Sequence, residues 1–334
     1  MYKLKEKPED FIVDEVIEFT TSESGKYAII KVTKRETTCF KVVDLIVKTL
    51  GKSKNDVSYA GIKDRNAVTT QYMSIKNASK KQIERLKFDK VKVEYVGQSD
   101  EAIRLGRLKG NKFTITVREL EQPLKECKVF PNYFDSQRFS VNNIEIGKGI
   151  INGKFKASVE AILSYEGERD SYIEKTIKAY LEKHKNDYVG ALQLMQRGLL
   201  TLYVGAYQSY LFNEMLAEML REKHSDNVEV EESFGKLVFP KDEIDVTYEK
   251  LPIIGFTTDE TEEINKILAK EKITTRSFIV RSLRDATAPG GDRSVWCELK
   301  DVELGEFKDG VQTVSFYLKK GSYATMAIKA MMYS

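Results

Sequence analysis

One stretch of this chain, AGIKDRNAVTTQ at residues 60–71, places a carboxylate between two cations, just past a turn glycine. The segments 57–62 and 68–75 are apolar and β-branched enough to predict strands on either side. Asp64 would then lie in the short connection between them, where rigid scaffolds often hold catalytic groups. Lys63 and Arg65 favour its ionised form, which a nucleophile or an electrostatic stabiliser needs. On residue chemistry alone, Asp64 is either catalytic or a solvated turn residue.

Four further motifs give the same stretch a family context. They are LK (4–5) with PEDFIV (8–13), RLG (104–106) with LKGN (108–111) and FT (113–114), PNYF (131–134) with QRF (137–139), and GSYAT (321–325). Together with residues 60–71 they resemble, in the same order, the motifs of the TruD family of pseudouridine synthases. The resemblance runs from about residue 4 to 328 and so covers nearly the whole chain.

The resemblance implies isomerisation of uridine to pseudouridine in tRNA, at uridine 13 of the D-arm, with no cofactor and no metal. It implies that Asp64 is the catalytic aspartate, which either attacks C1′ of the ribose or assists departure of the uracil. A carboxylate that stays ionised in a dry pocket needs a cation nearby. Neighbouring side chains on extended backbone point to opposite sides, so a distant cation is expected, and Lys5 matches the family's basic position.

Phe134 matches the family's active-site phenylalanine and would stack on the extruded uracil. Asn132 would hydrogen-bond Asp64 or the uracil edge. At Asp135 and Ser140 the sequence departs from the family, which commonly has glycine at both positions. We expect these departures to affect the local backbone geometry rather than the reaction.

Basic residues near the motifs are the candidates for contacts with the RNA backbone. Residues 51–148 hold 20 Lys+Arg and 12 Asp+Glu, whereas residues 149–284 hold 19 and 23. This excess of positive charge is what an enzyme with a phosphate-rich substrate needs, although such runs are often only solvated faces. The predicted RNA-binding residues are Lys63, Arg65, Arg104, Arg107, Lys109, Lys112 and Arg138.

The periodicity of apolar residues predicts an α+β fold. Both ends of the chain combine strands with helices, which fits a pseudouridine-synthase core with a mixed, mainly antiparallel sheet. Strands are predicted at 27–32, 91–96, 112–120 and 311–318. Helices are predicted at 79–88, at 323–332 and over the apolar stripe up to residue 50, where Thr37 or Thr38 can cap the helix and Gly51 ends it. The middle has helical spacing, then short β-branched runs broken by Gly and Pro, and it is net acidic. We expect a catalytic domain at 1–149 and 285–334, interrupted by an inserted α+β domain at 150–284.

The cysteines, the histidines and the lengths of the apolar runs argue against several other classes of protein. The three cysteines, Cys39, Cys127 and Cys297, are scattered, and the two histidines are 40 residues apart, so neither a disulfide framework nor a zinc site is expected. No apolar run is long enough for a membrane span, and we expect a cytoplasmic protein without an obligate protein partner. Two rival classes are a non-catalytic protein that binds structured RNA and a phosphotransferase that works through an aspartyl intermediate. The second should show a P-loop or a metal-binding carboxylate cluster, and the sequence has neither.

Overall fold

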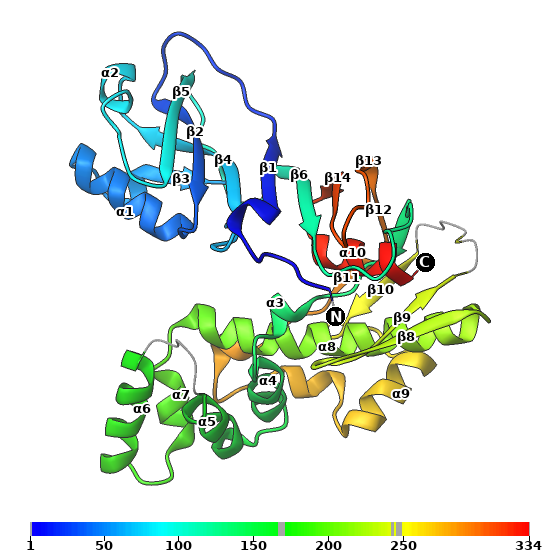
Figure 1. The fold of residues 1–334 in the computed structure, drawn as a ribbon. Coiled ribbons are helices and arrows are strands. Elements are labelled where there is room, and N and C mark those ends of the chain that lie inside the picture. Colours follow the sequence, from blue (N-terminus) through cyan, green and yellow to red (C-terminus); the bar gives the residue numbers. More distant parts are fainter. Residues whose placement is uncertain (1, 166–170, 242–243, 245–248, 334) are drawn as a thin grey trace. The chain divides into compact units, whose positions relative to one another are not determined.

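The structure is a computed structural model that describes residues 2–165, 171–241, 244 and 249–333. Its packing divides the chain into two compact units (Figure 1), and each is described here by itself. The first unit comprises Met1–Lys128 and Glu298–Met332, and the second comprises Val129–Cys297 and Tyr333–Ser334. The predicted insertion, 150–284, lies wholly within the second unit, whose limits are wider because residues 129–149 and 285–297 pack with it. The insertion limits themselves stay a prediction.

An eight-stranded sheet forms the centre of the first unit. Its path is β13-β14-β6-β1-β4-β2-β5, with β3 paired to β4. Within it β1 and β4 are parallel, and the other neighbours are antiparallel. The strands are β1 (Phe11–Ile17), β2 (Tyr27–Arg35), β3 (Val57–Tyr59), β4 (Val68–Lys76), β5 (Val91–Ser99), β6 (Leu108–Val117), β13 (Lys300–Leu304) and β14 (Gln312–Lys319). The predicted mixed, mainly antiparallel sheet is therefore confirmed.

Helix α1 (Cys39–Leu50) packs on one end of this sheet, as its apolar spacing predicts. The Thr38 hydroxyl accepts a hydrogen bond from the Lys41 N–H at its start, and Gly51 ends it in the left-handed conformation with φ of 62°. Val42 and Ile46 of α1 pack with residues of β2, β4 and β5 in one apolar cluster. The helix predicted over 79–88 is wrong in length: α2 (Lys80–Ile83) is one turn, because Phe88 pairs with Val91 and leads the chain into β5.

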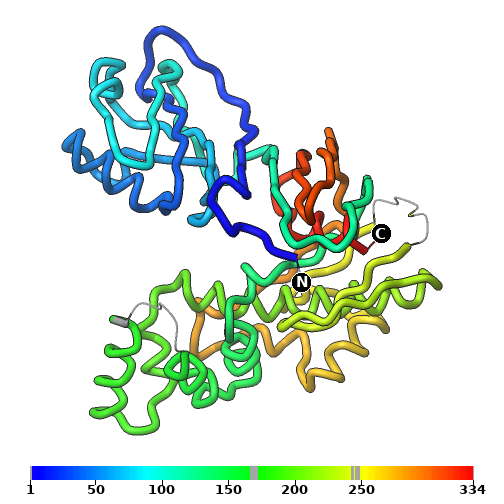
Figure 2. Tube along the Cα trace, viewed as in Figure 1, coloured from blue at the N-terminus to red at the C-terminus, as the bar shows by residue number. Residues whose placement is uncertain are grey.

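The C-terminal segment completes the other end of the sheet. β14 pairs with β6 along eight residues, which brings together parts of the chain about 200 residues apart (Figure 2). The pairing requires a glycine at Gly110, where a Cβ would lie 2.2 Å from the Leu318 carbonyl oxygen. Helix α10 (Ala324–Tyr333) follows β14 and buries most of its residues, as predicted for a C-terminal strand and helix.

The second unit is built on one long helix, α8 (Arg197–Lys223). Its apolar residues form a cluster with residues of five further helices, among them Ile146, Val159 and Ile267. These helices are α4 (Asn143–Ile151), α5 (Phe155–Leu163), α6 (Ser171–Lys183), α7 (Tyr188–Gln193) and α9 (Glu262–Glu271). The short elements are α3 (Ser136–Phe139), β7 (Val129–Pro131), β8 (Asn227–Glu232), β9 (Gly235–Pro240), β10 (Lys250–Ile253), β11 (Gly291–Ser294) and β12 (Trp296–Glu298).

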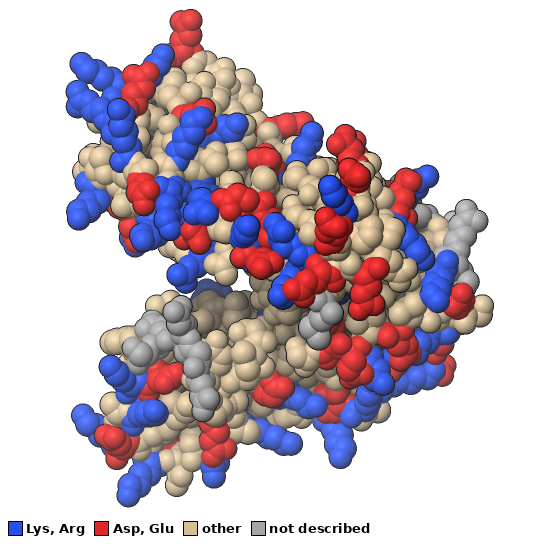
Figure 3. Space-filling model, viewed as in Figure 1, with Lys and Arg blue, Asp and Glu red and all other residues tan. Residues whose placement is uncertain are grey.

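The two units differ in charge. Basic and acidic side chains are interspersed on the face seen in Figure 3. The first unit nevertheless holds 32 Lys+Arg and 24 Asp+Glu, a net charge of +8, whereas the second holds 22 and 27, a net charge of −5. The charge asymmetry predicted from the sequence therefore follows the division into compact units.

An ion pair connects Asp10 of the N-terminal motif to Arg118, the residue that follows strand β6. Asp10 is 3% exposed, and the Arg118 guanidinium donates to both of its carboxylate oxygens, at 2.9 and 2.8 Å. The hydrogen bonds from Arg118 hold the pKa of Asp10 below its ordinary value. Because this pKa is lowered on folding, the pair stabilises the protein above the unfolded-state pKa of about 4, and the stabilisation is lost as the pH falls through the folded-state pKa.

We predict that Asp10→Asn lowers the free energy of unfolding at pH 7 by about 1–3 kcal/mol. The difference from wild type should shrink below about pH 4, because the unfolded chain takes up this proton first. Urea unfolding at pH 7, 5 and 3 measures it. Asp44→Asn, at an exposed ion pair with Lys54, is the control and should change stability by less than about 0.5 kcal/mol. A difference for Asp10→Asn that stays constant down to pH 3 would contradict the assignment.

Candidate active site

Asp64 lies in the loop between β3 and β4, as the sequence predicts. The Lys5 ammonium group donates to Asp64 Oδ2 at 2.9 Å, although the two residues are 59 positions apart. Both side chains are partly exposed, at 27% for Lys5 and 21% for Asp64. Lys5 has φ of 59° and its Nζ lies 4.1 Å from the centroid of the Phe11 ring. The predicted distant cation is therefore present, and the Asp64 carboxylate is both paired and open to solvent.

A second lysine, Lys34 at the end of β2, holds the main chain of the same loop. Its side chain is fully buried, and Nζ donates to the carbonyl oxygens of Thr37, at 2.8 Å, and of Asp64. Burial disfavours the charged ammonium and lowers the pKa of Lys34, while the nearby Cys39 and Asp64 act in the opposite direction. Lys34 was not singled out by the sequence, and it is the residue that links β2 to the Asp64 peptide.

Lys63, next to Asp64, points into the protein. Its side chain is 5% exposed and Nζ lies 2.7 Å from Oε1 of Glu15, whose side chain is fully buried. The other carboxylate oxygen of Glu15 accepts the Tyr72 N–H at 2.8 Å. A sequestered ammonium that is already paired is unsuited to a phosphate contact, so the structure corrects the assignment of Lys63 to RNA binding. Arg65, by contrast, is exposed, so the two cations that flank Asp64 differ in burial.

Two uncharged side chains hold the remaining backbone of the loop. The Cys39 sulfur accepts the Lys63 N–H at 3.2 Å, and its thiol donates to Gln71 Oε1 at 2.9 Å. Gln71 Nε2 in turn donates to the carbonyl oxygen of Gly61 at 3.5 Å. The loop is thus fixed from α1 and β4 as well as from β2, and buried Cys39 has a structural role here.

A second cluster surrounds Phe134 in the second unit. Asn213 of α8 holds the Phe134 peptide from both sides, since its Oδ1 accepts the N–H at 2.9 Å and its Nδ2 donates to the carbonyl at 2.8 Å. The Phe134 ring meets Phe212 edge-to-face at 5.5 Å. The Arg293 guanidinium lies over the ring, 4.0 Å from its centroid. Phe134 is 9% exposed, so its ring is packed and oriented rather than open.

Asn132 orients Arg293. Its main-chain and side-chain oxygens accept hydrogen bonds from Arg293 Nε and Nη2, at 2.9 and 2.7 Å. Its side-chain nitrogen donates to the Ser294 carbonyl at 3.0 Å. In this structure the amide therefore holds the guanidinium on Phe134, a role that differs from the predicted contact with Asp64 or uracil.

The residues after Phe134 form a short capped helix. Asp135 is buried and its carboxylate accepts the Ser136 N–H at 2.7 Å at the start of α3. Ser140 ends α3 with φ of 50°, a conformation that favours glycine, which agrees with the family's preference there. Arg138 is half-buried, and its Nε donates to Ser209 Oγ at 3.0 Å, so part of its guanidinium is bound to α8.

The four cations of the 104–112 segment are exposed, as an RNA contact requires. Arg107 is paired with Glu101 and Lys109 with Glu18. Such exposed pairs are weak and exchange readily for other partners. The geometry therefore leaves these residues available for phosphate binding.

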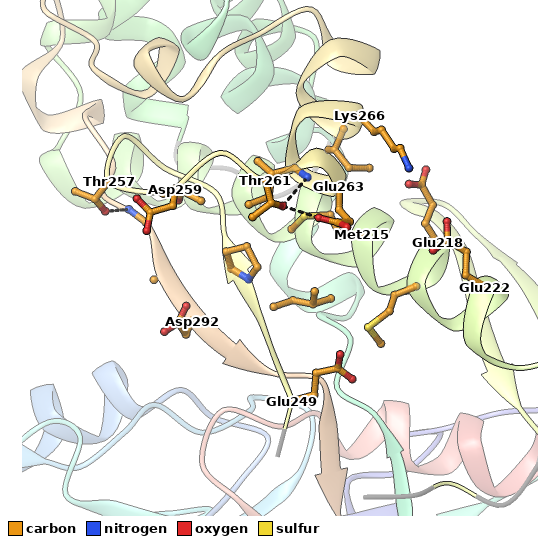
Figure 4. A pocket seen from close by; sticks show the side chains of 18 of the residues that line it. Met215, Glu218, Glu222, Glu249, Thr257, Asp259, Thr261, Glu263, Lys266 and Asp292 are labelled. Carbon is orange, nitrogen blue, oxygen red and sulfur yellow. Dashed lines mark hydrogen bonds between the residues drawn. The ribbon is translucent and has the colours of Figure 1, made fainter. Parts of the chain in front are cut away.

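A pocket of about 630 Å³ lies elsewhere in the second unit, between α8, α9 and β10 (Figure 4). Its lining holds six carboxylates, those of Glu218, Glu222, Glu249, Asp259, Glu263 and Asp292, against two lysines. This excess of negative charge repels phosphate groups, so we leave the pocket out of the candidate site. Among the described residues, no group of three His, Cys, Asp or Glu side chains is placed to hold a metal ion.

The sequence carried a signal for two of the missed residues. In β1, Glu15 lies on the same face of the strand as the buried Phe11 and Val13. In β2, Lys34 lies on the same face as the buried Ile30 and Val32. A charged residue at a position that continues an apolar stripe indicates a buried charge with a specific partner. Arg293 and Asn213 were not singled out from the sequence, and their partners lie 161 and 79 residues away.

Comparison with known proteins gives this arrangement its class. The family model for tRNA pseudouridine synthase D (TruD) matches residues 2–171, 167–250 and 247–331. A Methanocaldococcus jannaschii protein named "Probable tRNA pseudouridine synthase D 2" is 32% identical, over 98% of this chain and 90% of its own. A Methanococcus maripaludis protein named "Probable tRNA pseudouridine synthase D 1" is 29% identical, over 98% of each chain.

The fold agrees with a solved structure. The crystal structure of a Methanosarcina mazei protein assigned as tRNA pseudouridine synthase D superposes with a TM-score of 0.74 and 25% identity, over 98% of this chain and 93% of that one. The fold and the matches define a tRNA-modifying isomerase, a pseudouridine synthase. The chain belongs to the TruD family. Membership of this class of enzymes excludes the alternative of a non-catalytic RNA-binding protein. None of the described helices is long and apolar enough to cross a bilayer.

Proposed function

We propose that the enzyme converts a uridine of the tRNA D-arm, at position 13, to pseudouridine, with Asp64 as the catalytic carboxylate. The ion pair between Lys5 Nζ and Asp64 Oδ2, at 2.9 Å, carries this proposal. It supports an ionised carboxylate at a partly exposed position, where a substrate can reach it. The target position rests on the resemblance to the family, and the cytoplasm, which holds the tRNA, is the proposed place of action.

In the proposed reaction the bond between N1 of uracil and C1′ breaks, the base turns, and C5 bonds to C1′. C5 loses a proton and N1 gains one, so nothing is oxidised or added. Asp64 attacks C1′ or assists departure of the uracil, and Lys5 offsets the charge of the carboxylate. The target base leaves its stack, which costs a few kcal/mol that phosphate contacts offset.

Phe134 is the proposed stacking residue for the extruded base. The fixed placement of this residue supports the role, since Asn213 holds its main chain and Phe212 packs against its ring. Asp64 and Phe134 belong to different compact units, so the two roles are tested separately.

We predict that Asp64→Asn abolishes pseudouridine formation and leaves folding and tRNA binding intact, because an amide carries no charge and is a poor nucleophile. Mapping of pseudouridine in an unmodified tRNA transcript measures the reaction, and Asp44→Asn serves as the matched control at an exposed carboxylate. Near wild-type conversion by pure Asp64→Asn would remove Asp64 from the mechanism.

For Phe134 the conservative change to Leu limits the cavity that a smaller residue would leave. We expect Phe134→Leu to slow the reaction by roughly 5- to 160-fold, which corresponds to a stacking energy of about 1–3 kcal/mol. The Kd for tRNA should change less than about twofold, since backbone contacts dominate affinity. Phe212→Leu, in the neighbouring ring, controls for lost packing. Equal slowing by both variants would assign Phe134 to the core.

The RNA track is tested by salt dependence. We expect Arg107→Gln with Lys109→Gln to weaken tRNA binding and to flatten the slope of log Kd against log salt by about one to two, because each lost phosphate contact removes about 0.7–0.9. The matched control is Lys175→Gln with Lys178→Gln, two exposed lysines of α6. A larger effect of the α6 pair would place the phosphate contacts in the second unit.

A further inference from the structure

The burial of Lys34 lacks a reason in packing. Lys34 shares its face of β2 with Ile30 and Val32, and all three side chains are fully buried. In the part of the chain that the structure describes, its ammonium group bonds to two main-chain carbonyl oxygens and to no carboxylate. Burying an ammonium without a charged partner is costly. An apolar side chain would suit the strand better, so the charge serves another purpose.

The partner of Lys34 is the peptide of Asp64 itself. Covalent geometry keeps the carboxylate of a residue within a few ångströms of its own carbonyl oxygen. The Lys34 ammonium, which is itself fully buried, therefore lies close enough to the Asp64 carboxylate for the two charges to attract each other. Lys5 binds the same carboxylate from a side chain that is 27% exposed, so solvent weakens its attraction.

We propose that Lys34 is a positioning residue of the pseudouridine synthase: it fixes the Asp64 main chain and supplies a second, buried positive charge that keeps the carboxylate ionised when the substrate excludes water. This inference rests on the proposed role of Asp64. Through Thr37, the same ammonium joins the loop to the start of α1, whose capping residue is Thr38. The Lys34 ammonium group thus connects β2, the start of α1 and the Asp64 loop.

The charged and titratable neighbours of this site permit a test by pH. Cys39 of α1, together with Asp64 and Lys63 of the loop, acts on Lys34, and Lys5 binds Asp64. The other carboxylate of the region, Glu15, is bound by Lys63 and the Tyr72 N–H rather than by Lys34. Loss of the Lys34 charge therefore acts on Asp64, and it should move the acid limb of the rate profile to higher pH.

The experiment compares Lys34→Met and Lys34→Gln with wild type in single-turnover reactions on a tRNA transcript from pH 4 to 9. We expect Lys34→Met to lower the rate constant at pH 7 at least 10-fold, with the Kd for tRNA within twofold. The acid limb should rise by about one pH unit, the size of effect that a nearby charge exerts. Lys34→Gln, which keeps donors but no charge, should show the same shift with a smaller loss of rate, and it carries the test if the Met variant does not fold.

The control is Lys31→Met, the same substitution at a half-buried lysine on the same strand, which should leave the rate and the profile unchanged. Wild-type rates and an unmoved acid limb in both Lys34 variants would overturn the inference while Asp64→Asn stays inactive. If Asp64→Asn is itself active, the proposed function fails, and that result is separate from the behaviour of Lys34. A lower melting temperature with an unmoved acid limb would show a purely structural role and also overturns the proposal.

Discussion

A carboxylate held among lysines is the constraint on which the loop between β3 and β4 depends. Asp64 is bound at its side chain by Lys5 and at its main chain by Lys34. Lys63, the residue before it, is buried and forms an ion pair with buried Glu15. Each of the three lysines, Lys5, Lys34 and Lys63, thus has an acceptor for its ammonium group. These acceptors reduce the free-energy cost of burying Lys34 and Lys63.

The sheet order explains why these groups meet. β4, which follows the loop, lies between β1 and β2. β1 brings Glu15 and the preceding Lys5, while β2 brings Lys34, so three distant segments reach the same end of β4. The parallel pairing of β1 with β4 aligns Ile12 with Val68, just after the loop. A register slip by one residue would turn these side chains to the opposite face.

The motifs of the family thereby acquire separate physical tasks. In the N-terminal motif Asp10 binds Arg118 and Phe11 packs beside Lys5, so these two residues help to place the Lys5 cation. Gly110 permits the close pairing of β6 with β14. In the PNYF motif Asn132 and Phe134 together hold Arg293. The family motifs do not distinguish these residues from one another. Their contacts in the structure show which of them hold the backbone or another side chain in place.

The sequence by itself determined the local elements and the place of Asp64. The sequence predicted a strand at 27–32 and, from period-two alternation, another at 91–96, because neighbouring residues encode backbone periodicity. It offered Thr37 or Thr38 as the cap of helix α1 and Gly51 as its end, and the structure has Thr38 and Gly51. The length of the helix after Ser79 could not be predicted in this way. It is one turn long, and Phe88, which the prediction included in the helix, instead pairs with Val91 at the start of β5.

Tertiary structure alone decided which charges are buried and what they bind. Lys63 and Arg65 look equivalent in the sequence, yet one is buried against Glu15 and the other is exposed. Lys5 could be chosen as the partner of Asp64 only through the family, and Lys34 and Arg293 were not foreseen at all. Such contacts join segments 30 to 161 residues apart, so they follow from sheet order and helix packing, which local sequence patterns do not encode.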